Sequence, residues 1–172
     1  MFKHHTRLIA AAGAVATAGV IATTGAMAAA AAPHPARAAT SGAESFQIMT
    51  TSATGTPSVI TSGVFTAAGA DQENQTANTA KFVFANGTVS LKHSSGKGTQ
   101  SVNPKTCLAT LNFHGTYTLT GGTGAYSGVT GSGTYKLSIL AIAARSGGKC
   151  DLNKPPVAWH QVVNATGIAT LP

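Results

Sequence analysis

Acidic side chains are scarce in this chain of 172 residues, which contains four of them: Glu44, Asp71, Glu73 and Asp151. Each falls in a predicted loop or at the start of a predicted strand. A glycoside hydrolase needs two carboxyl groups that flank the scissile bond at a fixed separation. We therefore exclude a glycosidase, and acid–base catalysis by paired carboxylates is poorly supported.

Basic residues are more frequent, but they form no cluster: the 11 Lys and Arg residues are isolated and stand mostly near turns. A surface that binds nucleic acid shows a concentrated basic stripe with aromatic side chains for stacking. The sequence therefore predicts a mildly basic, solvated surface and no nucleic-acid partner.

Motifs for metals, phosphates and nucleophilic serines are also missing. No Cys-x-x-Cys pair occurs, and His114 and His160 fall on the opposite strand parity from His93, so the three histidines do not converge on a metal. The glycine-rich segment 120–128 is not followed by the helix that a phosphate cradle or a nucleophile elbow requires. We expect neither a metal nor a cofactor.

Helical periodicity is absent as well, and alternation of apolar and polar residues takes its place. Segments 107–119 and 129–141 flank the glycine-rich turn, and each has the period of two that is typical of a half-buried strand. The sequence predicts a long antiparallel pair. Its apolar parity consists of Cys107, Ala109, Leu111, Phe113, Tyr117 and Leu119 before the turn and Val129, Tyr135, Leu137, Ile139 and Ala141 after it.

A tight hairpin is predicted over residues 81–93. Asn86-Gly87 separates two alternating runs, and both residues tolerate the positive φ of a type I′ turn. Counting outward from this turn pairs Phe84 with Val89 and Phe82 with Leu91, so four apolar side chains share one face.

Three more strands are predicted at residues 45–50, 59–67 and 157–171, whereas the polar segment 71–78 is interpreted as an exposed loop. Seven strand signals without a covering helix leave two architectures, a sandwich or a closed barrel. The long central strands favour an all-β, antiparallel barrel. Gly115, Gly131 and Gly133 fall on the apolar parity, where a curved wall needs small residues.

The N-terminal segment is typical of a secretion signal. Lys3 and Arg7 precede an apolar, Ala-rich run over residues 8–21, which is too short to remain a stable anchor in a bilayer. We predict a signal peptide over residues 1–28, with residue 38 as the alternative end, then a disordered leader over 29–42 and the barrel domain over 43–172. No twin-Arg pair precedes the apolar run, which favours the general secretory route and a secreted protein without stable membrane insertion. Cleavage after residue 28 lowers the formal charge from +7 to +5, because Lys3 and Arg7 are removed.

Two cysteines remain after such cleavage, Cys107 and Cys150. In an oxidising compartment, two lone thiols in one small domain are expected to form a disulfide. The bridge would connect the start of one long strand to the segment 146–156.

The glycine-rich turn also carries a resemblance to a known family. The run Gly121-Gly122-Thr123-Gly124-Ala125-Tyr126-Ser127-Gly128-Val129-Thr130-Gly131 resembles the signature turn of allene oxide cyclase-like and dirigent-like proteins. The resemblance implies an eight-stranded antiparallel barrel whose lumen holds apolar small molecules. Some relatives cyclise a reactive intermediate or guide its coupling, and many bacterial members have no assigned activity.

If the apolar parity faces the lumen, polar residues on it become candidates for ligand binding. His93 and Gln161 could hydrogen-bond a ligand, and Tyr117 and Tyr135 add phenol groups; alternatively, His93 lies in solvent and Gln161 bonds a neighbouring backbone group. Tyr126 is expected to fold back and plug the barrel end, with Gly115, Gly131 and Gly133 leaving it room. The predicted apolar lining consists of Phe82, Phe84, Leu111, Phe113, Leu137 and Trp159.

Three functions are compatible with these observations. The first is a secreted barrel that binds an apolar small molecule in its lumen. The second is a cyclase or isomerase of the allene oxide cyclase-like type, in which the lumen confines a reactive substrate. The third is a structural extracellular protein whose lumen is filled by its own side chains. A homo-oligomer is compatible with all three, and the sequence does not decide whether the protein is an enzyme.

Overall fold

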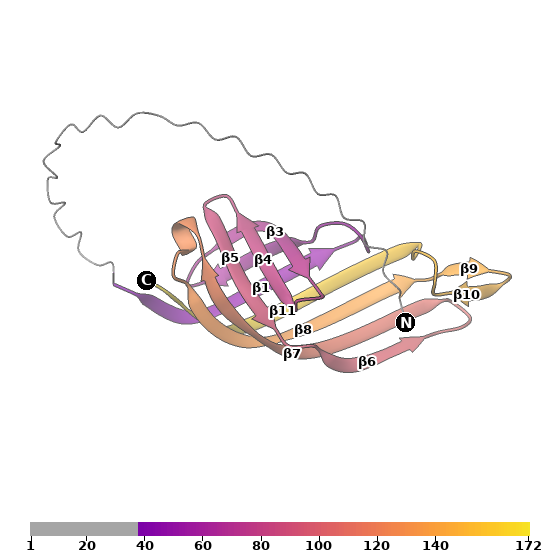
Figure 1. Cartoon of the computed structure of the whole chain (residues 1–172). Helices are drawn as coiled ribbons and strands as arrows, with labels where there is room; N and C mark the ends of the chain where they lie inside the picture. Colours follow the sequence, from indigo (N-terminus) through magenta and orange to yellow (C-terminus); the bar gives the residue numbers. More distant parts are fainter. Residues whose placement is uncertain (1–37) are drawn as a thin grey trace, which may run out of the picture. The chain divides into compact units, whose positions relative to one another are not determined.

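The computed structural model of the protein describes residues 38–172 (Figure 1). The predicted signal peptide and residues 29–37 of the predicted leader lie outside the described residues. Residues 40–42, the end of the predicted leader, are not disordered: they pair with residues 169–171 near the C-terminus and form the start of the first strand.

The described part of the chain is almost entirely strand, with one short 3-10 turn. The elements are β1 (Thr40–Thr50), β2 (Ser58–Gly63), β3 (Ala67–Asn74), β4 (Thr79–Phe84), β5 (Gly87–His93), β6 (Lys97–Val102), β7 (Leu108–Gly122), η1 (Gly124–Tyr126), β8 (Thr130–Ile142), β9 (Ala144–Ser146), β10 (Lys149–Asp151) and β11 (Ala158–Leu171).

Eight of these strands form a closed antiparallel barrel. The order around it is β5-β4-β3-β2-β1-β11-β8-β7, and a second pairing between β5 and β7 closes the ring. The predicted all-β class and the antiparallel barrel are thus confirmed. Closure leaves each of these strands with a neighbour on both sides, so the barrel wall itself has no free edge.

One side of the barrel continues into a sheet extension. β6 pairs with the first half of β7, whereas β5 pairs with its second half, so β5 and β6 lie one after the other along the same edge. The long strands β7, β8 and β11 therefore extend beyond the closed ring, and the β9–β10 hairpin lies at the far end of this extension (Figure 1). The predicted disulfide between Cys107 and Cys150 is present and ties the start of β7 to this hairpin.

The predicted hairpin of β4 and β5 is present, but its register differs from the prediction. Phe84 pairs with Gly87 and Phe82 with Val89, so the turn residues are Ala85 and Asn86. Gly87 instead belongs to the strand, with φ of +145°, and its Cα lies so close to the carbonyl of Thr123 that a Cβ would have no room. The close approach of the glycine-rich turn therefore determines where the glycine stands. The face assignment survives, because the register is shifted by two residues.

The predicted exposed loop over 71–78 was wrong for residues 71–74, which belong to β3, whereas residues 75–78 do form a turn. The single strand predicted over 59–67 was also wrong, because β2 ends at Gly63 and β3 begins at Ala67. The chain reverses after β2, where the Thr61 hydroxyl oxygen lies 2.9 Å from the Phe65 carbonyl oxygen, and β3 then runs to Asn74. Asp71 consequently lies inside the barrel and is only 6% exposed. Strand pairing with β2 and β4 supplies the order that the polar sequence of β3 does not predict.

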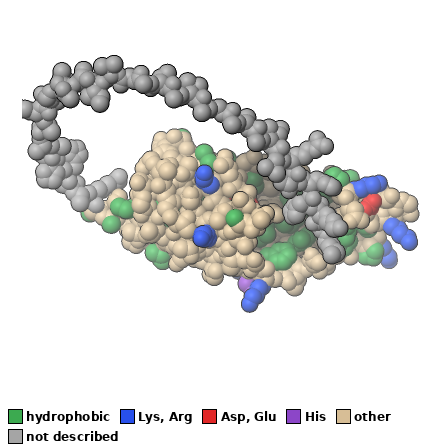
Figure 2. Space-filling view, in the orientation of Figure 1, with side chains coloured by type: hydrophobic (Ala, Val, Ile, Leu, Met, Phe, Trp, Pro, Cys, Tyr) green, Lys and Arg blue, Asp and Glu red, His purple; other side chains and the backbone are tan. Residues whose placement is uncertain are grey.

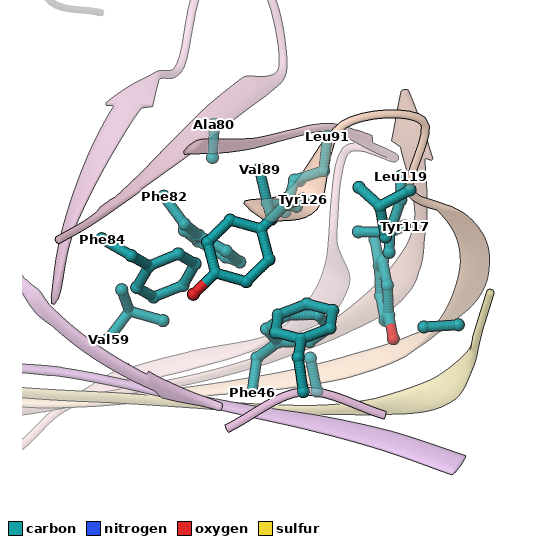
Figure 3. Close-up of a cluster of buried hydrophobic side chains, with 14 of the residues drawn as sticks. Phe46, Val59, Ala80, Phe82, Phe84, Val89, Leu91, Tyr117, Leu119 and Tyr126 are labelled. Carbon is teal, nitrogen blue, oxygen red and sulfur yellow. The ribbon is translucent and has the colours of Figure 1, made fainter. Parts of the chain in front are cut away.

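Aromatic side chains fill one half of the barrel, which we call the closed half and define by Phe65, Phe84, Val89, Tyr126 and Val129. The Tyr126 ring lies 5.0 Å from the Phe65 ring and 5.3 Å from the Phe84 ring, as tilted and edge-on contacts. Figure 3 shows Tyr126 beside Phe84 in the cluster of buried side chains. Such offset pairs are favourable beyond the area they bury. The prediction that Tyr126 folds back over the barrel end is confirmed.

Two of the glycines predicted to leave room for Tyr126, Gly115 and Gly133, leave room for other side chains. A Cβ at Gly115 would meet the Tyr135 ring, and one at Gly133 would meet the Tyr117 ring. These glycines accommodate the two lumen tyrosines rather than Tyr126, as the strand pairings place Gly115 beside Tyr135 and Gly133 beside Tyr117.

Candidate functional site

The other half of the barrel, the open half, contains a cavity of about 540 Å³ that opens toward the sheet extension. Apolar side chains are visible in the hollow beside the barrel wall (Figure 2). Its floor and walls come from β1, β4, β5, β7, β8 and β11, and β3 adds two carboxyl groups. A volume of this size is in the range of small-molecule sites.

Eight of the ten residues predicted to contact a ligand line this cavity. They are His93, Gln161, Tyr117, Tyr135, Phe82, Phe113, Leu137 and Trp159. They come from β4, β5, β7, β8 and β11, and the alternating pattern of those strands directs them inward.

The remaining two predicted residues, Phe84 and Leu111, do not line the cavity. Phe84 lies two positions further along β4 than Phe82 and packs in the closed half against Tyr126. Leu111 lies on the inner face of β7 in the sheet extension, where it pairs with Ile139. Face parity was predicted correctly for both, but parity does not give depth along the barrel axis.

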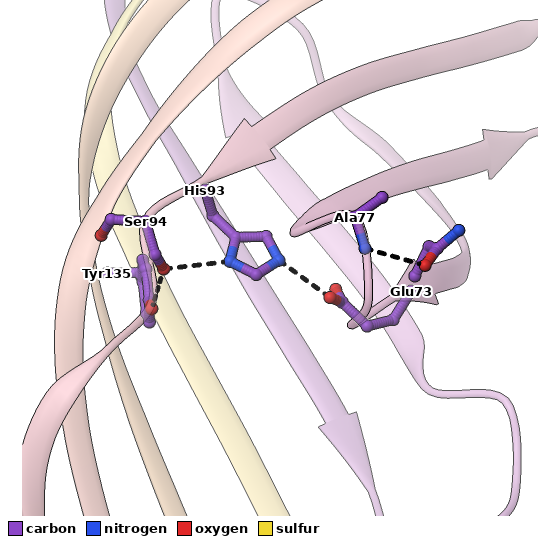
Figure 4. A network of polar contacts seen from close by, with 6 residues as sticks. Glu73, Ala77, His93, Ser94 and Tyr135 are labelled. Atoms are coloured by element: carbon purple, nitrogen blue, oxygen red, sulfur yellow. Dashed lines mark hydrogen bonds and ion pairs between the residues drawn. The ribbon is translucent and has the colours of Figure 1, made fainter. Parts of the chain in front are cut away.

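A polar network stands at the mouth of the cavity and is centred on His93 (Figure 4). Its Nε2 lies 2.8 Å from Oε1 of Glu73, and its Nδ1 lies 3.1 Å from the carbonyl oxygen of Ser94. The same carbonyl accepts a hydrogen bond from the Tyr135 hydroxyl (2.9 Å). The alternative that His93 lies free in solvent is therefore wrong, because both ring nitrogens have protein partners.

The partners of His93 restrict where its protons are. A carbonyl can only accept, so Nδ1 carries a hydrogen. Oε1 of Glu73 is the partner of Nε2, so the two side chains form a hydrogen-bonded pair at one side of the mouth.

Asp71 lies deeper than this pair and is the most perturbed acid of the cavity. Burial, with a smaller contribution from the negative charge of Glu73, raises its pKa from 3.8 to about 7, and His93 opposes this shift. One of its oxygens, Oδ1, is buried without a hydrogen-bond partner. A carboxyl group of this kind holds a proton at neutral pH far more readily than an ordinary aspartate.

Two further lining residues have buried polar atoms without partners, namely the hydroxyl of Tyr117 and Nε1 of Trp159. Burial, together with the nearby Glu44, raises the pKa of Tyr117 to about 12, so its phenol is neutral. In proteins most buried polar atoms are hydrogen-bonded. Unpartnered atoms on three residues that line one cavity are therefore notable.

Asp71 and Glu73 were missed because β3 has no β-branched or aromatic residue to identify it as a strand. Their spacing did contain a signal: Asp71 and Glu73 are two apart and continue the parity of Ala67 and Gly69. Extending the alternation from the preceding run would have placed both carboxyls on one face.

Within residues 38–172, no group of three metal-binding side chains is arranged around a common point, and no helix is both long and apolar enough to cross a membrane. Fold and site together define a class: a closed antiparallel β-barrel with a filled half and a half that holds a cavity. Comparison with models of known protein families, with curated proteins and with solved structures found no match.

Proposed function

We propose that the protein is a secreted β-barrel that binds an apolar small molecule in the open half of its lumen. The cavity of about 540 Å³ carries this proposal, because a barrel with a purely structural role gains stability by filling such a space. Its lining is mainly apolar, with a few convergent polar groups at the mouth and on one wall, which is the usual composition of a ligand site.

Secretion and family membership belong to the same proposal. The basic start and apolar run at the N-terminus support export by the general secretory route, and the disulfide is compatible with an extracellular location. The glycine-rich turn and the closed eight-stranded barrel support membership of the allene oxide cyclase-like and dirigent-like family.

Uptake of N-phenylnaphthylamine, an uncharged apolar dye that brightens when it leaves water, tests the binding proposal. We expect saturable fluorescence enhancement with one site per chain. Leu137→Trp places a large ring in the cavity and should abolish most of the signal. Ile168→Trp makes the same kind of change at a residue of β11 that is 56% exposed, and it should leave dye binding unchanged. Equal binding by both variants would contradict a lumenal site.

A cyclase or isomerase is the second candidate, and the titratable cluster of Asp71, Glu73 and His93 favours it. A group with a pKa near the working pH can both give and take a proton, as general acid–base catalysis requires. Replacing His93 and Gln161 separates the two functions, because an enzyme should lose turnover while it still retains the ligand. Candidate substrates for this test are the compounds that copurify with the protein.

A further inference from the structure

The unpartnered groups of the cavity differ from its other polar groups in what they can offer a ligand. The carbonyl of Ser94 is already used as an acceptor by both His93 and Tyr135. Trp159 Nε1 can only donate a hydrogen bond, and the neutral phenol of Tyr117 can donate one. A protonated Asp71 carboxyl adds a third donor, while Gln161 can act in either sense.

Asp71 is the group from which a ligand would gain most. It is only 6% exposed and lines the cavity, and Oδ1 of its carboxyl has no hydrogen-bond partner in the described part of the chain. The charged groups that face it are Glu73 on its own strand and His93 on β5. Glu73 disfavours the ionised form of Asp71, and His93, which opposes this effect, is itself hydrogen-bonded to Glu73.

We propose that the occupant of the lumen is an apolar molecule with an acceptor oxygen of the ketone or carbonyl type. This oxygen accepts a hydrogen bond from the protonated carboxyl of Asp71, so binding weakens when this carboxyl ionises. The inference rests on the proposed lumenal binding function and specifies its ligand. It also predicts the direction in which ligand affinity changes with pH. The affinity is highest at acid pH and falls as the pH rises through the titration of Asp71, because the ionised carboxylate repels an acceptor oxygen.

A matched pair of probes tests this proposal. Acetylnaphthalene carries a ketone, and ethylnaphthalene has the same rings and nearly the same shape without the oxygen. Equilibrium dialysis against the full mature protein at about pH 5.5 and about pH 8.5 measures both affinities on either side of the Asp71 titration. We expect the ketone to bind roughly three- to tenfold more tightly than the hydrocarbon at the lower pH, the value of one hydrogen bond. This preference should disappear at the higher pH.

Variants assign the preference to Asp71. In Asp71→Asn the side chain keeps a donor that does not titrate, so the ketone preference should persist at both pH values. In Asp71→Leu it should be lost at both, while ethylnaphthalene still binds. Asp151→Asn removes a carboxyl from the β9–β10 hairpin, outside the cavity, and should behave as the unmodified protein.

The outcomes test the ligand assignment and the proposed binding function separately. Equal affinity for both probes, or a pH dependence that persists in Asp71→Asn, would overturn the ligand assignment and leave lumenal binding intact. Ketone binding that strengthens at the higher pH would overturn it as well. If neither probe binds at either pH, the proposed function fails together with the inference.

Discussion

The lumen contains two buried carboxyl groups, and they differ in their hydrogen bonding. Glu44 is 2% exposed and is satisfied: Oε1 accepts from the Thr61 hydroxyl (2.7 Å), and Oε2 accepts from the backbone N–H of Phe65 (3.1 Å). Asp71, at 6% exposure, has an oxygen with no partner. Burial raises the pKa of both, but only for Glu44 do hydrogen bonds oppose the shift.

The same contrast extends to the two halves of the barrel. In the closed half, aromatic rings pack on one another, and Glu44 holds the reversal between β2 and β3. In the open half, a cavity remains, and Asp71, Tyr117 and Trp159 have unpartnered atoms. Because both empty volume and unpaired polar atoms lower stability, the open half should contribute less to stability than the closed half, which supports the proposed binding of a ligand there.

The largest expected effect distinguishes the packing of the two halves. Phe84→Ala removes a ring from the closed half and should lower the free energy of unfolding by about 3–5 kcal/mol. Leu137→Ala only enlarges an existing cavity and should cost about 1 kcal/mol. Urea unfolding midpoints measure both. Similar losses would mean that the two halves are equally important for stability.

Removal of the disulfide should follow in size. Cys107→Ala with Cys150→Ala releases a constraint between residues 43 apart in sequence and should cost about 4 kcal/mol in the chain-entropy description. Hydrogen exchange should increase mainly in the first residues of β7 and in β10. An increase concentrated around Tyr126 would contradict this local role.

Asp71→Asn should stabilise the ligand-free protein increasingly as the pH rises above about 4, and most of all at alkaline pH. The carboxyl titrates near pH 3.8 when unfolded and near 7 when folded, so its stabilising contribution is complete below the first value, declines between the two values and is lost above the second. At about pH 8.5 the variant should gain about 2–4 kcal/mol over the parent, from 1.36 kcal/mol per pKa unit. Near pH 4 the two should unfold alike. Thermal unfolding across this range measures the difference, and a gain that is independent of pH would contradict the assignment.

The smallest effects compare two hydroxyl groups. Thr61→Val removes the donor to Glu44 and should cost about 1–2 kcal/mol, because a buried acceptor loses its partner. Tyr117→Phe removes a hydroxyl that has no partner and should change stability by less than about 0.5 kcal/mol. Denaturant titration of the ligand-free proteins resolves the pair. A larger loss in Tyr117→Phe would reveal a partner for that hydroxyl.

The sequence predicted the fold where side chains alternate clearly. In β7, β8 and β11 the apolar parity placed Tyr117, Leu137 and Trp159 correctly on the inner face. Depth along the barrel was not predictable in this way, because period two gives the face of a residue and not the strand stagger. Phe84 and Phe82 share a face, yet only Phe82 lines the cavity.

The carboxyl wall of the site was not predictable from strand propensity. Asp71 and Glu73 belong to a polar segment that is a strand because β2 and β4 pair with it. Such tertiary pairing overrides local preference. The register of the β4–β5 hairpin was not predictable for a related reason. Gly87 is positioned by the carbonyl of Thr123, which is 36 positions away in the sequence.

Native mass spectrometry of the protein, purified gently from the organism that produces it, tests the central claim most directly. If the open half is a binding site, the spectrum will contain a non-covalent mass above that of the oxidised chain, and Leu137→Trp will lack it while Ile168→Trp retains it. A clean ligand-free mass for the unmodified protein, together with failure to take up N-phenylnaphthylamine, would contradict the claim and leave a barrel whose cavity serves no ligand.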